Sequence, residues 1–454
     1  MKKKSIIEIK IEEVEFPSKG IGYYEGKKIY VKNGIVGQVV KVYIKKVRKE
    51  YAEGKLLEVI SRSENERDSF CPHFGLCGGC ANQTVEYDDQ VKLKEKLVKK
   101  LLDDAGVKGY EFEGIEKSPE VYEYRNKMEY SFGDETKGGI LNLGMHKRGS
   151  FQSVVTVDQC KLVDDDFNKI LKTALDYFRE RQVPHYNAKT HQGFLRHFIV
   201  RKAKGTKEIL VNLVTSTQMD MDMSQLVEMT KNLDLDGKLV GYLHTFNDNL
   251  SDCVTNEKLE ILYGRDYFYE EILGLKFKIS AFSFFQTNPL GAEKLYSIAM
   301  DYMGDAKDKV VYDLYCGTGT IGQIASTRSK EVYGIELIEE AVEAANENAK
   351  LNGLTNCQFI AGDVFEKLDE LAKKPEVIIV DPPRVGINPK ALKKILRYKC
   401  KEIVYVSCNP KSLAENLADM QEYGYKVKKV RCMDMFPHTP HVETVVRIEK
   451  ALSK

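Results

Sequence analysis

A cysteine, an aspartate and a glycine-rich turn each follow an apolar run in the C-terminal third of the chain. Cys408 comes directly after residues 402–406, within the motif Ser-Cys-Asn-Pro, and Asp381 follows residues 376–380. The turn Tyr-Cys-Gly-Thr-Gly-Thr-Ile-Gly at 315–322 follows a third such run. Short β-branched runs are typical of buried parallel strands, whose carboxyl ends meet at the ligand-binding edge of an open α/β sheet. We therefore expect a thiol nucleophile and a cofactor loop to share one cleft.

The turn has the composition of a nucleotide-binding loop. Gly317, Gly319 and Gly322 form a G-x-G-x-x-G pattern, which lets the backbone turn tightly and approach a ligand. Glu336 follows the next apolar run, where a carboxylate accepts hydrogen bonds from ribose hydroxyls. Asp363 follows the run after that, in a position suited to an adenine amino group. These features suit a dinucleotide and S-adenosylmethionine alike.

Glu443 interrupts the otherwise apolar run of residues 442–448. A carboxylate in such a run is either a salt-bridged edge residue or a general base with a raised pKa. A free cysteine is more often a small buried hydrophobe than a nucleophile. Cys408 is distinguished by its position at a strand end, beside polar residues and before a proline.

A second group of cysteines lies far from Cys408 in the sequence. Cys71, Cys77 and Cys80 form the spacing C-x5-C-x2-C in a glycine-rich segment, and Cys160 is available as a fourth ligand. This spacing alone favours zinc and an iron–sulfur cluster equally.

Composition describes a globular protein of several domains. The chain has 454 residues, 43% hydrophobic and 30% charged, with ten cysteines and no apolar run near the twenty residues of a membrane span. Reduced thiols or metal ligands are therefore expected, and cytoplasm is the expected compartment. The net charge is +1, but residues 1–60 contain 14 Lys and Arg against 8 Asp and Glu. A basic segment on a slightly acidic body predicts binding to a polyanion.

Three domains are expected from the pattern of elements, giving an α/β protein. Residues 1–62 contain five short strands separated by glycine turns, which predicts a small OB-like β-barrel. Residues 63–275 form a mixed α+β region that contains the cysteine-rich loop. In residues 276–454 strands and helices alternate, which predicts a Rossmann-like doubly wound sheet.

Four motifs together resemble the RNA uracil-5-methyltransferases. They are Phe-Gln-Thr-Asn at 285–288, Asp-Pro-Pro-Arg at 381–384, Ser-Cys-Asn-Pro at 407–410 and His-Val-Glu-Thr-Val at 441–445. The resemblance covers essentially the whole chain, and the N-terminal barrel resembles the TRAM domain that this family uses to bind RNA. It implies a class I methyltransferase domain and S-adenosylmethionine as methyl donor.

The resemblance also implies a role for each site residue. Cys408 matches the nucleophile that adds to C6 of uracil, and Glu443 matches the base that removes the C5 proton. The residues expected at the S-adenosylmethionine site are Gln286, Tyr315, Gly317, Gly319, Glu336, Asp363 and Asp381. The target base must leave its stack to reach them.

A ribosomal substrate and a [4Fe–4S] cluster follow from the same resemblance. Family members that act on ribosomal RNA hold this cluster on four cysteines that match Cys71, Cys77, Cys80 and Cys160, whereas the tRNA members are expected to lack both cluster and barrel. The expected substrate is therefore 23S ribosomal RNA, with no obligate protein partner. Candidate RNA contacts are Arg125, Asn126, Lys127, Arg196 and His197. The alternatives are a tRNA uracil-5-methyltransferase, an NAD-dependent oxidoreductase and a non-catalytic RNA-binding protein.

Overall fold

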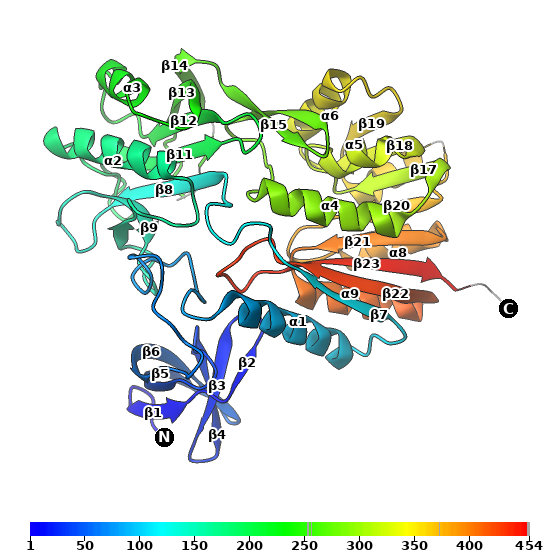
Figure 1. Cartoon of the computed structure of the whole chain (residues 1–454), viewed down its shortest axis with the longest axis horizontal. Coiled ribbons are helices and arrows are strands. Elements are labelled where there is room, and N and C mark those ends of the chain that lie inside the picture. Colours follow the sequence, from blue (N-terminus) through cyan, green and yellow to red (C-terminus); the bar gives the residue numbers. More distant parts are fainter. Residues whose placement is uncertain (252–253, 256, 372, 452–454) are drawn as a thin grey trace.

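The computed structural model describes residues 1–251, 254–255, 257–371 and 373–451, which form three parts (Figure 1). An N-terminal barrel and a central sheet lie on one side, and the C-terminal sheet lies on the other. Within these residues, no helix combines the length and the apolar character needed to cross a membrane.

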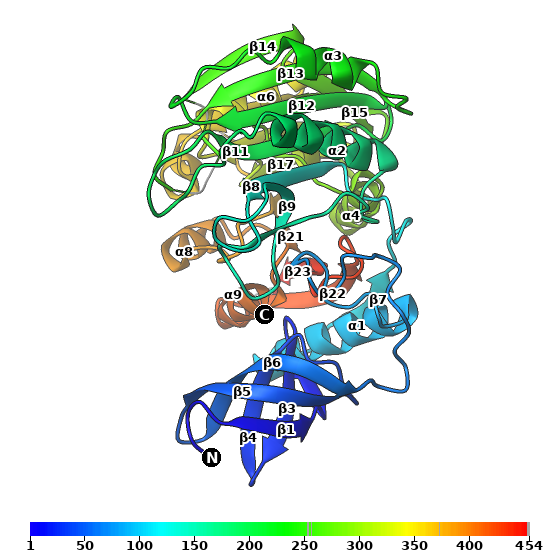
Figure 2. The same cartoon turned by 90° about the vertical axis from the view of Figure 1, so that its left-hand side faces the viewer.

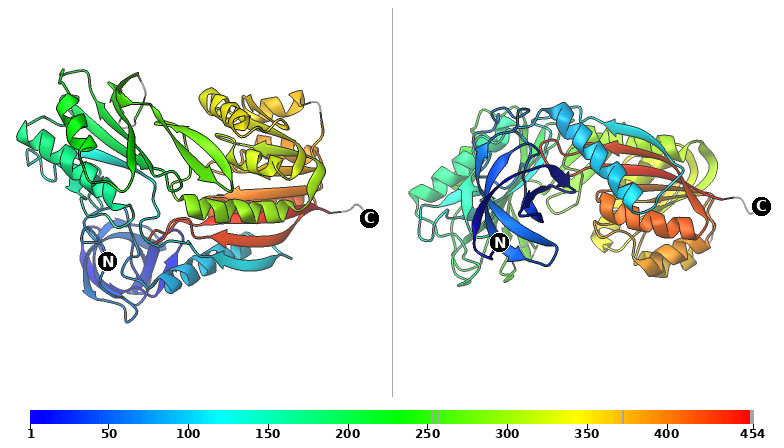
Figure 3. Two further views of the ribbon diagram at one scale, coloured as in Figure 1. Left: turned by 45° about the horizontal axis from the view of Figure 1, so that its top comes forward. Right: turned by 90° about the horizontal axis from the view of Figure 1, so that it is seen from below.

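The N-terminal part is a six-stranded curved sheet, seen nearly end-on in Figure 3. Its order is β1-β5-β6-β4-β3-β2, and isoleucine and valine side chains fill its interior. Five strands were expected in this part, and the sixth arises because β1 pairs with β5 whereas the separate strand β2 pairs with β3. The strands are β1 (Ile6–Lys10), β2 (Glu13–Glu15), β3 (Lys19–Tyr24), β4 (Lys27–Lys32), β5 (Val39–Val47) and β6 (Tyr51–Ser61).

The central part is a seven-stranded sheet covered by two helices, α2 (Asp165–Glu180) and α3 (Ser224–Lys231). Neighbouring strands are antiparallel except for the pair β12–β13. In sheet order the strands are β10 (Val154–Thr156), β9 (Asn142–His146), β8 (Lys127–Gly133), β11 (Leu195–Lys202), β12 (Glu208–Thr215), β13 (Lys238–Phe246) and β14 (Lys258–Gly264). A separate hairpin, β15 (Tyr267–Ile272) and β16 (Leu275–Ser280), leads into the C-terminal part.

The C-terminal part is an eight-stranded sheet whose first five strands are parallel. In sheet order the strands are β19 (Cys357–Ala361), β18 (Ser329–Glu336), β17 (Ala306–Leu314), β20 (Val377–Val380), β21 (Glu402–Ser407), β23 (Glu443–Lys450), β22 (Tyr425–Met433) and β7 (Glu111–Glu116). The helices are α1 (Tyr87–Asp104), α4 (Pro289–Met303), α5 (Thr320–Ser326), α6 (Glu339–Leu351), α7 (Val364–Lys367), the short 3₁₀ helix η1 (Leu368–Glu370), α8 (Pro389–Arg397) and α9 (Pro410–Glu422).

The central strands of this sheet are apolar along their whole length because both faces are covered. In β20, Ile378 and Val380 pack in the core under α1, α8 and α9, whereas Val377 and Ile379 pack in the core under α4 and α5. Strands buried on both faces have continuous apolar sequences instead of alternating ones. The expected doubly wound sheet is therefore present, and its carboxyl edge is free to hold polar side chains.

The domain boundaries expected from the sequence differ from the observed ones in two places. Helix α1 and strand β7, expected in the central domain, belong to the C-terminal part, because β7 pairs in parallel with β22 and α1 packs beside α9. The expected boundary after residue 275 falls inside the hairpin β15–β16. Both differences arise from contacts between residues distant in the sequence.

The segment between β22 and β23 connects the sheet to the cysteine-rich loop. The carbonyl oxygen of His438 in this segment accepts hydrogen bonds from the backbone N–H groups of Ala81 and Asn82, at 2.8 and 3.1 Å. Helix α1 anchors the same segment through Lys94, whose buried ammonium lies 2.6 Å from Asp434. Figure 2 shows the barrel below α1.

Candidate active site

The glycine-rich turn after β17 has the conformation that its sequence requires. Tyr315, Gly317 and Gly319 all have positive φ angles, between 53° and 72°. A Cβ atom on Gly319 would lie 2.7 Å from the ring of Phe359. The turn therefore depends on glycine both for its conformation and for its packing.

Two carboxylates, Glu336 and Asp363, lie close to this turn at the carboxyl edge of the sheet. Glu336, at the end of β18, accepts hydrogen bonds from the backbone N–H groups of Gly317 and Ile338, both at 3.1 Å. These bonds hold its carboxylate against the turn. Asp363, after β19, caps helix α7 by accepting from the N–H of Phe365 at 2.8 Å. Both side chains lie at the carboxyl edge of the sheet, as the sequence predicts.

The Phe-Gln-Thr-Asn motif forms the turn that begins α4. Asn288 caps the helix, and its side-chain amide donates to the oxygens of Ser118 and Met435 at 3.1 and 2.9 Å. The preceding residue Gln286 forms a side-chain hydrogen bond that lowers the otherwise raised pKa of Tyr296. This motif thus connects the linker before β8, the sheet and the 434–442 segment.

The thiol of Cys408 stands at the carboxyl end of β21. The next residue, Asn409, caps α9, and its amide donates to the carbonyl oxygen of Arg384 at 2.8 Å. This bond joins the Ser-Cys-Asn-Pro motif to the Asp-Pro-Pro-Arg motif. Burial, followed by the nearby charges of Glu443 and Asp381, raises the pKa of Cys408 to about 11, whereas Arg384 lowers it.

Glu443 lies next to Cys408 because β23 runs antiparallel to β21. Ser407 pairs with Thr444, so the register brings the first residue of β23 to the end of β21. The side chain of Glu443 is only 4% exposed. Burial and the nearby Asp381 raise its pKa to about 8, and Arg384 lowers it. A buried carboxyl with such a pKa is suited to accept a proton near neutral pH.

Two further aspartates complete this acidic group. Asp381 follows β20, and burial raises its pKa although part of the side chain remains accessible to solvent. Asp313, at the end of β17, is fully buried, and burial followed by the nearby Asp381 raises its pKa to about 8. Asp313 was not among the site residues expected from the sequence, although it directly precedes the Leu-Tyr-Cys-Gly turn.

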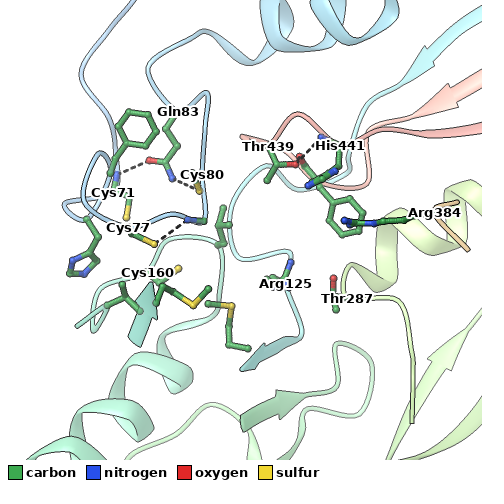
Figure 4. Close-up of a pocket in the computed structure, with 18 residues that line it drawn as sticks. Cys71, Cys77, Cys80, Gln83, Arg125, Cys160, Thr287, Arg384, Thr439 and His441 are labelled. Atoms are coloured by element: carbon green, nitrogen blue, oxygen red, sulfur yellow. Dashed lines mark hydrogen bonds between the residues drawn. The ribbon is translucent and has the colours of Figure 1, made fainter. Parts of the chain in front are cut away.

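All four cysteines of the second group line one cavity of about 360 Å³. Figure 4 shows the thiols at one end, from the loop 71–80 and from Cys160 after β10. Two sulfur atoms already accept hydrogen bonds, Cys77 from the N–H of Gly79 and Cys80 from the amide of Gln83, both at 3.3 Å. Burial raises the pKa of the Cys77, Cys80 and Cys160 thiols.

The arrangement of these thiols bears on the choice between zinc and a cluster. A structural zinc needs four ligand atoms within about 2.3 Å of one point. Among the described residues, no three His, Cys, Asp or Glu side chains converge in a way that could hold a single metal ion. The four thiols share one cavity, but their arrangement by itself shows neither a zinc site nor a cluster.

The candidate RNA contacts divide into two groups, and their contact with RNA stays a prediction. Arg125 lines the cavity, and its Nε donates to the carbonyl of Lys127 at 3.0 Å. Asn126 is buried, and its N–H donates to the carbonyl of Thr287 at 2.8 Å. Lys127 begins β8 and lies 3.6 Å from Glu129.

The second group, Arg196 and His197, is buried in the central part, each only 4% exposed. The guanidinium of Arg196 donates to three backbone carbonyls, those of Asn247, Asn249 and Ser251, each at 2.7 Å. It also stacks on the ring of Tyr186. These bonds hold the segment after β13 and leave little of Arg196 for a ligand.

Arg384, to which the sequence alone assigned no role, lies close to the candidate site. It affects the pKa of Cys408, Glu443 and His441, so it lies close to all three. It also lines the cavity of the four cysteines. Its position three residues after Asp381, at the same strand end, was the signal available in the sequence.

Two known families match the chain. Residues 86–451 match the family described as tRNA (Uracil-5-)-methyltransferase, and residues 2–57 match the TRAM domain. An uncharacterized RNA methyltransferase from Clostridium tetani is 54% identical, with 99% of each chain covered. Another from Caldanaerobacter subterraneus is 53% identical and covers 99% of this chain and 100% of its own.

A solved structure also resembles the whole chain. It is the Pyrococcus abyssi tRNA (uracil-54, C5)-methyltransferase in complex with S-adenosyl-L-homocysteine. The match has a TM-score of 0.75 and 26% identity, and it covers 97% of this chain and 100% of the other. The similarity therefore extends over the barrel, the central part and the C-terminal sheet.

Proposed function

The chain belongs to the tRNA (uracil-5-)-methyltransferase family, and we propose that this RNA uracil-5-methyltransferase acts on 23S ribosomal RNA with S-adenosylmethionine as methyl donor. The observation that supports the chemistry best is the proximity of Cys408 and Glu443 at one sheet edge. S-adenosylmethionine supplies an electrophilic methyl group. Gln286, Tyr315, Gly317, Gly319, Glu336, Asp363 and Asp381 are proposed to bind it, with Glu336 facing the ribose and Asp363 the adenine.

The reaction uses the thiol first and the carboxylate second. The Cys408 sulfur forms a bond to C6 of uracil, which moves electron density to C5 and makes this carbon nucleophilic. After C5 has received the methyl group, the Glu443 carboxylate removes the C5 proton. The electron pair of that C–H bond forms the C5–C6 double bond again, and the C6–S bond breaks to release the thiolate. The proton taken from C5 is then on Glu443, and its release to solvent returns the enzyme to its starting state.

A proton must leave Cys408 before it attacks. Burial, followed by the nearby Glu443 and Asp381, raises its pKa and keeps the thiol neutral in the free protein. Arg384 acts in the opposite direction. We propose that the positive charge of the methyl donor favours the thiolate once the donor is bound, so that a reactive sulfur forms only in the loaded enzyme.

The four cysteines Cys71, Cys77, Cys80 and Cys160 are proposed to hold a [4Fe–4S] cluster. Methyl transfer itself requires no electron, so the cluster would act as a structural connection between the loop 71–80 and the segment after β10. The backbone bonds from Ala81 and Asn82 to His438 would carry its effect to the segment that precedes Glu443.

The barrel does not distinguish ribosomal from transfer RNA. The Pyrococcus abyssi enzyme, named as a tRNA methyltransferase, matches 97% of this chain. The unmatched residues are far fewer than those of the barrel, so the match includes the barrel. The expectation that tRNA members lack the barrel is therefore wrong. A tRNA substrate is the second candidate on this ground, and the ribosomal proposal rests on the cysteine pattern.

The test is methyl transfer from S-[methyl-³H]-adenosylmethionine to 23S ribosomal RNA and to tRNA, both isolated from cells that lack 5-methyluridine. We expect label in the ribosomal RNA at a discrete uridine, mapped by mass spectrometry of nuclease fragments. Label in tRNA alone would show that the substrate is tRNA and not 23S ribosomal RNA, and it would leave the proposed methyl-transfer chemistry unchanged. Label in neither RNA with the wild-type enzyme would contradict both.

A further inference from the structure

The cavity of the four cysteines has a second end that the cluster would not occupy. Figure 4 shows Arg125, Thr287, Arg384 and His441 on the side away from the thiols. They come from the linker before β8, the turn before α4, the segment after β20 and the segment before β23. We call these four residues the cationic end.

Neither arginine of the cationic end forms an ion pair within the part of the chain that the structure describes. The Nε of Arg125 donates only to the carbonyl of Lys127, a neutral group, and no side-chain partner is present for Arg384. Arginines on protein surfaces commonly lie beside carboxylates, as Arg431 does with Glu116 at 2.7 Å. Two guanidinium groups without a carboxylate at one cavity are therefore available to an anionic ligand.

The nearby acids neutralise this charge only in part. Burial raises the pKa of Glu443 to about 8 and that of Asp381 to about 7, so near pH 7 Glu443 is mostly protonated and Asp381 is about half protonated. Burial also lowers the pKa of His441 to about 4, with further contributions from Arg384, Lys94 and Arg125. The imidazole is thus a neutral group that can donate one hydrogen bond.

The cationic end adjoins the reacting thiol. Arg384 lies close enough to Cys408 to lower its pKa, and the amide of Asn409 is bonded to the Arg384 carbonyl. When the target uridine flips out of its strand so that its base enters the cleft, the phosphates on either side of this nucleotide lie beside the entrance of the cleft. The anion at this position would be part of the RNA substrate itself.

We propose that the cationic end binds a phosphodiester group adjacent to the target uridine, through the guanidinium groups of Arg125 and Arg384. Thr287 and His441 add neutral hydrogen-bond donors. The two arginines supply the positive charge that binds one phosphate. The inference deepens the proposed function by assigning the site that fixes the register of the RNA at the thiol.

The test measures binding of the oligonucleotide r(U)12, which contains uracil at every position and needs no knowledge of the natural target. The dissociation constant of the full-length, iron-loaded protein is measured from 50 to 500 mM KCl without methyl donor. For single strands, log K changes with log salt by about 0.7 per phosphate contact. Arg125→Gln and Arg384→Gln should each reduce the slope by about this amount, which is about fivefold less affinity lost over the tenfold salt range.

Two controls separate a specific contact from a general charge effect. Arg397→Gln removes an exposed arginine of the same domain, on helix α8 and outside the cavity, and should keep the wild-type slope. Arg384→Lys keeps the charge and should keep most of the slope. In the wild-type protein, r(U)12 should protect Arg125 and Arg384 from phenylglyoxal, whereas uridine should not, and Arg397 should react in both cases.

Wild-type slopes in both glutamine variants, or an equal reduction in Arg397→Gln, would overturn the proposal. So would phenylglyoxal modification of Arg125 and Arg384 that r(U)12 does not slow, a result that does not depend on the folding of any variant. Loss of iron from Arg125→Gln with an unchanged slope would show instead that Arg125 balances the charge of the cluster. The methyl-transfer assay is separate: a wild-type enzyme that binds r(U)12 through these arginines but methylates no RNA would refute only the proposed function.

Discussion

Replacing Glu443 by glutamine tests the order of the two chemical steps. Glutamine keeps the shape of the side chain but cannot accept the C5 proton, so the methylated covalent adduct should accumulate. Loss of a general base typically costs about 10²–10⁴-fold in rate. Adduct formation should not be slower, because the nearby Glu443 raises the pKa of Cys408 and the variant removes this effect.

The pH dependence provides a quantitative check. With a pKa of about 8, about one Glu443 side chain in ten is ionised at pH 7 and about one in a hundred at pH 6. The rate constant for adduct decay should therefore rise about 50-fold between pH 6 and pH 8 and then level off. Glu443→Gln should show a low and flat profile over the same range.

The assay is rapid-quench single turnover with labelled RNA, in which a denaturing gel separates the protein–RNA adduct from released product. Following adduct decay keeps the titration of the Cys408 thiol out of the measurement, because that group acts in adduct formation. Glu443→Asp is the matched control, since it keeps the carboxylate and should keep the rise with pH at a lower rate. Adduct decay in Glu443→Gln with the wild-type rate and pH slope would show that Glu443 is a structural strand residue.

Four further predictions follow from the same site. RNA with 5-fluorouridine should trap the enzyme as a denaturation-resistant adduct, because C5 then has no proton to lose, and Cys408→Ala should lose both trapping and turnover; near-normal turnover of that variant would refute the assignment. Anaerobically purified protein should be brown, with about four iron and four sulfide per chain, and Cys160→Ser should lose iron whereas Cys357→Ser should not; colourless protein with one zinc would contradict the cluster. Deletion of residues 1–61 should weaken RNA binding and flatten its salt dependence while S-adenosylmethionine binding persists; unchanged RNA binding would give the barrel another role. Asp313 has a pKa raised in the folded protein, so the folded state binds the extra proton and loses stability as pH rises from about 4 to about 8; Asp313→Asn should raise the melting temperature more at pH 8 than at pH 5, and an equal shift at both would exclude a raised pKa.

Sequence alone predicted the doubly wound sheet and the position of its reactive edge. These are local properties, because a run such as Val377–Val380 is apolar throughout only when both faces of a strand are covered. A polar residue directly after such a run must lie at the carboxyl edge, which is why Cys408, Asp381 and Glu336 could be expected in one cleft. The glycine turn is local in the same way, since the positive φ angles of Gly317 and Gly319 favour glycine.

Tertiary structure decided what depends on contacts between distant segments. Strand β7 belongs to the C-terminal sheet because it pairs in parallel with β22. The sequence of residues 111–116 does not indicate this pairing. The guanidinium of Arg196 donates hydrogen bonds to three carbonyls of a segment about fifty residues away. An arginine that was expected to contact RNA is therefore buried. Arg125 and Arg384 come together for the same reason. A side chain's type is encoded locally, but its neighbours, and hence its charge balance and its availability to a ligand, are set only when the whole chain has packed.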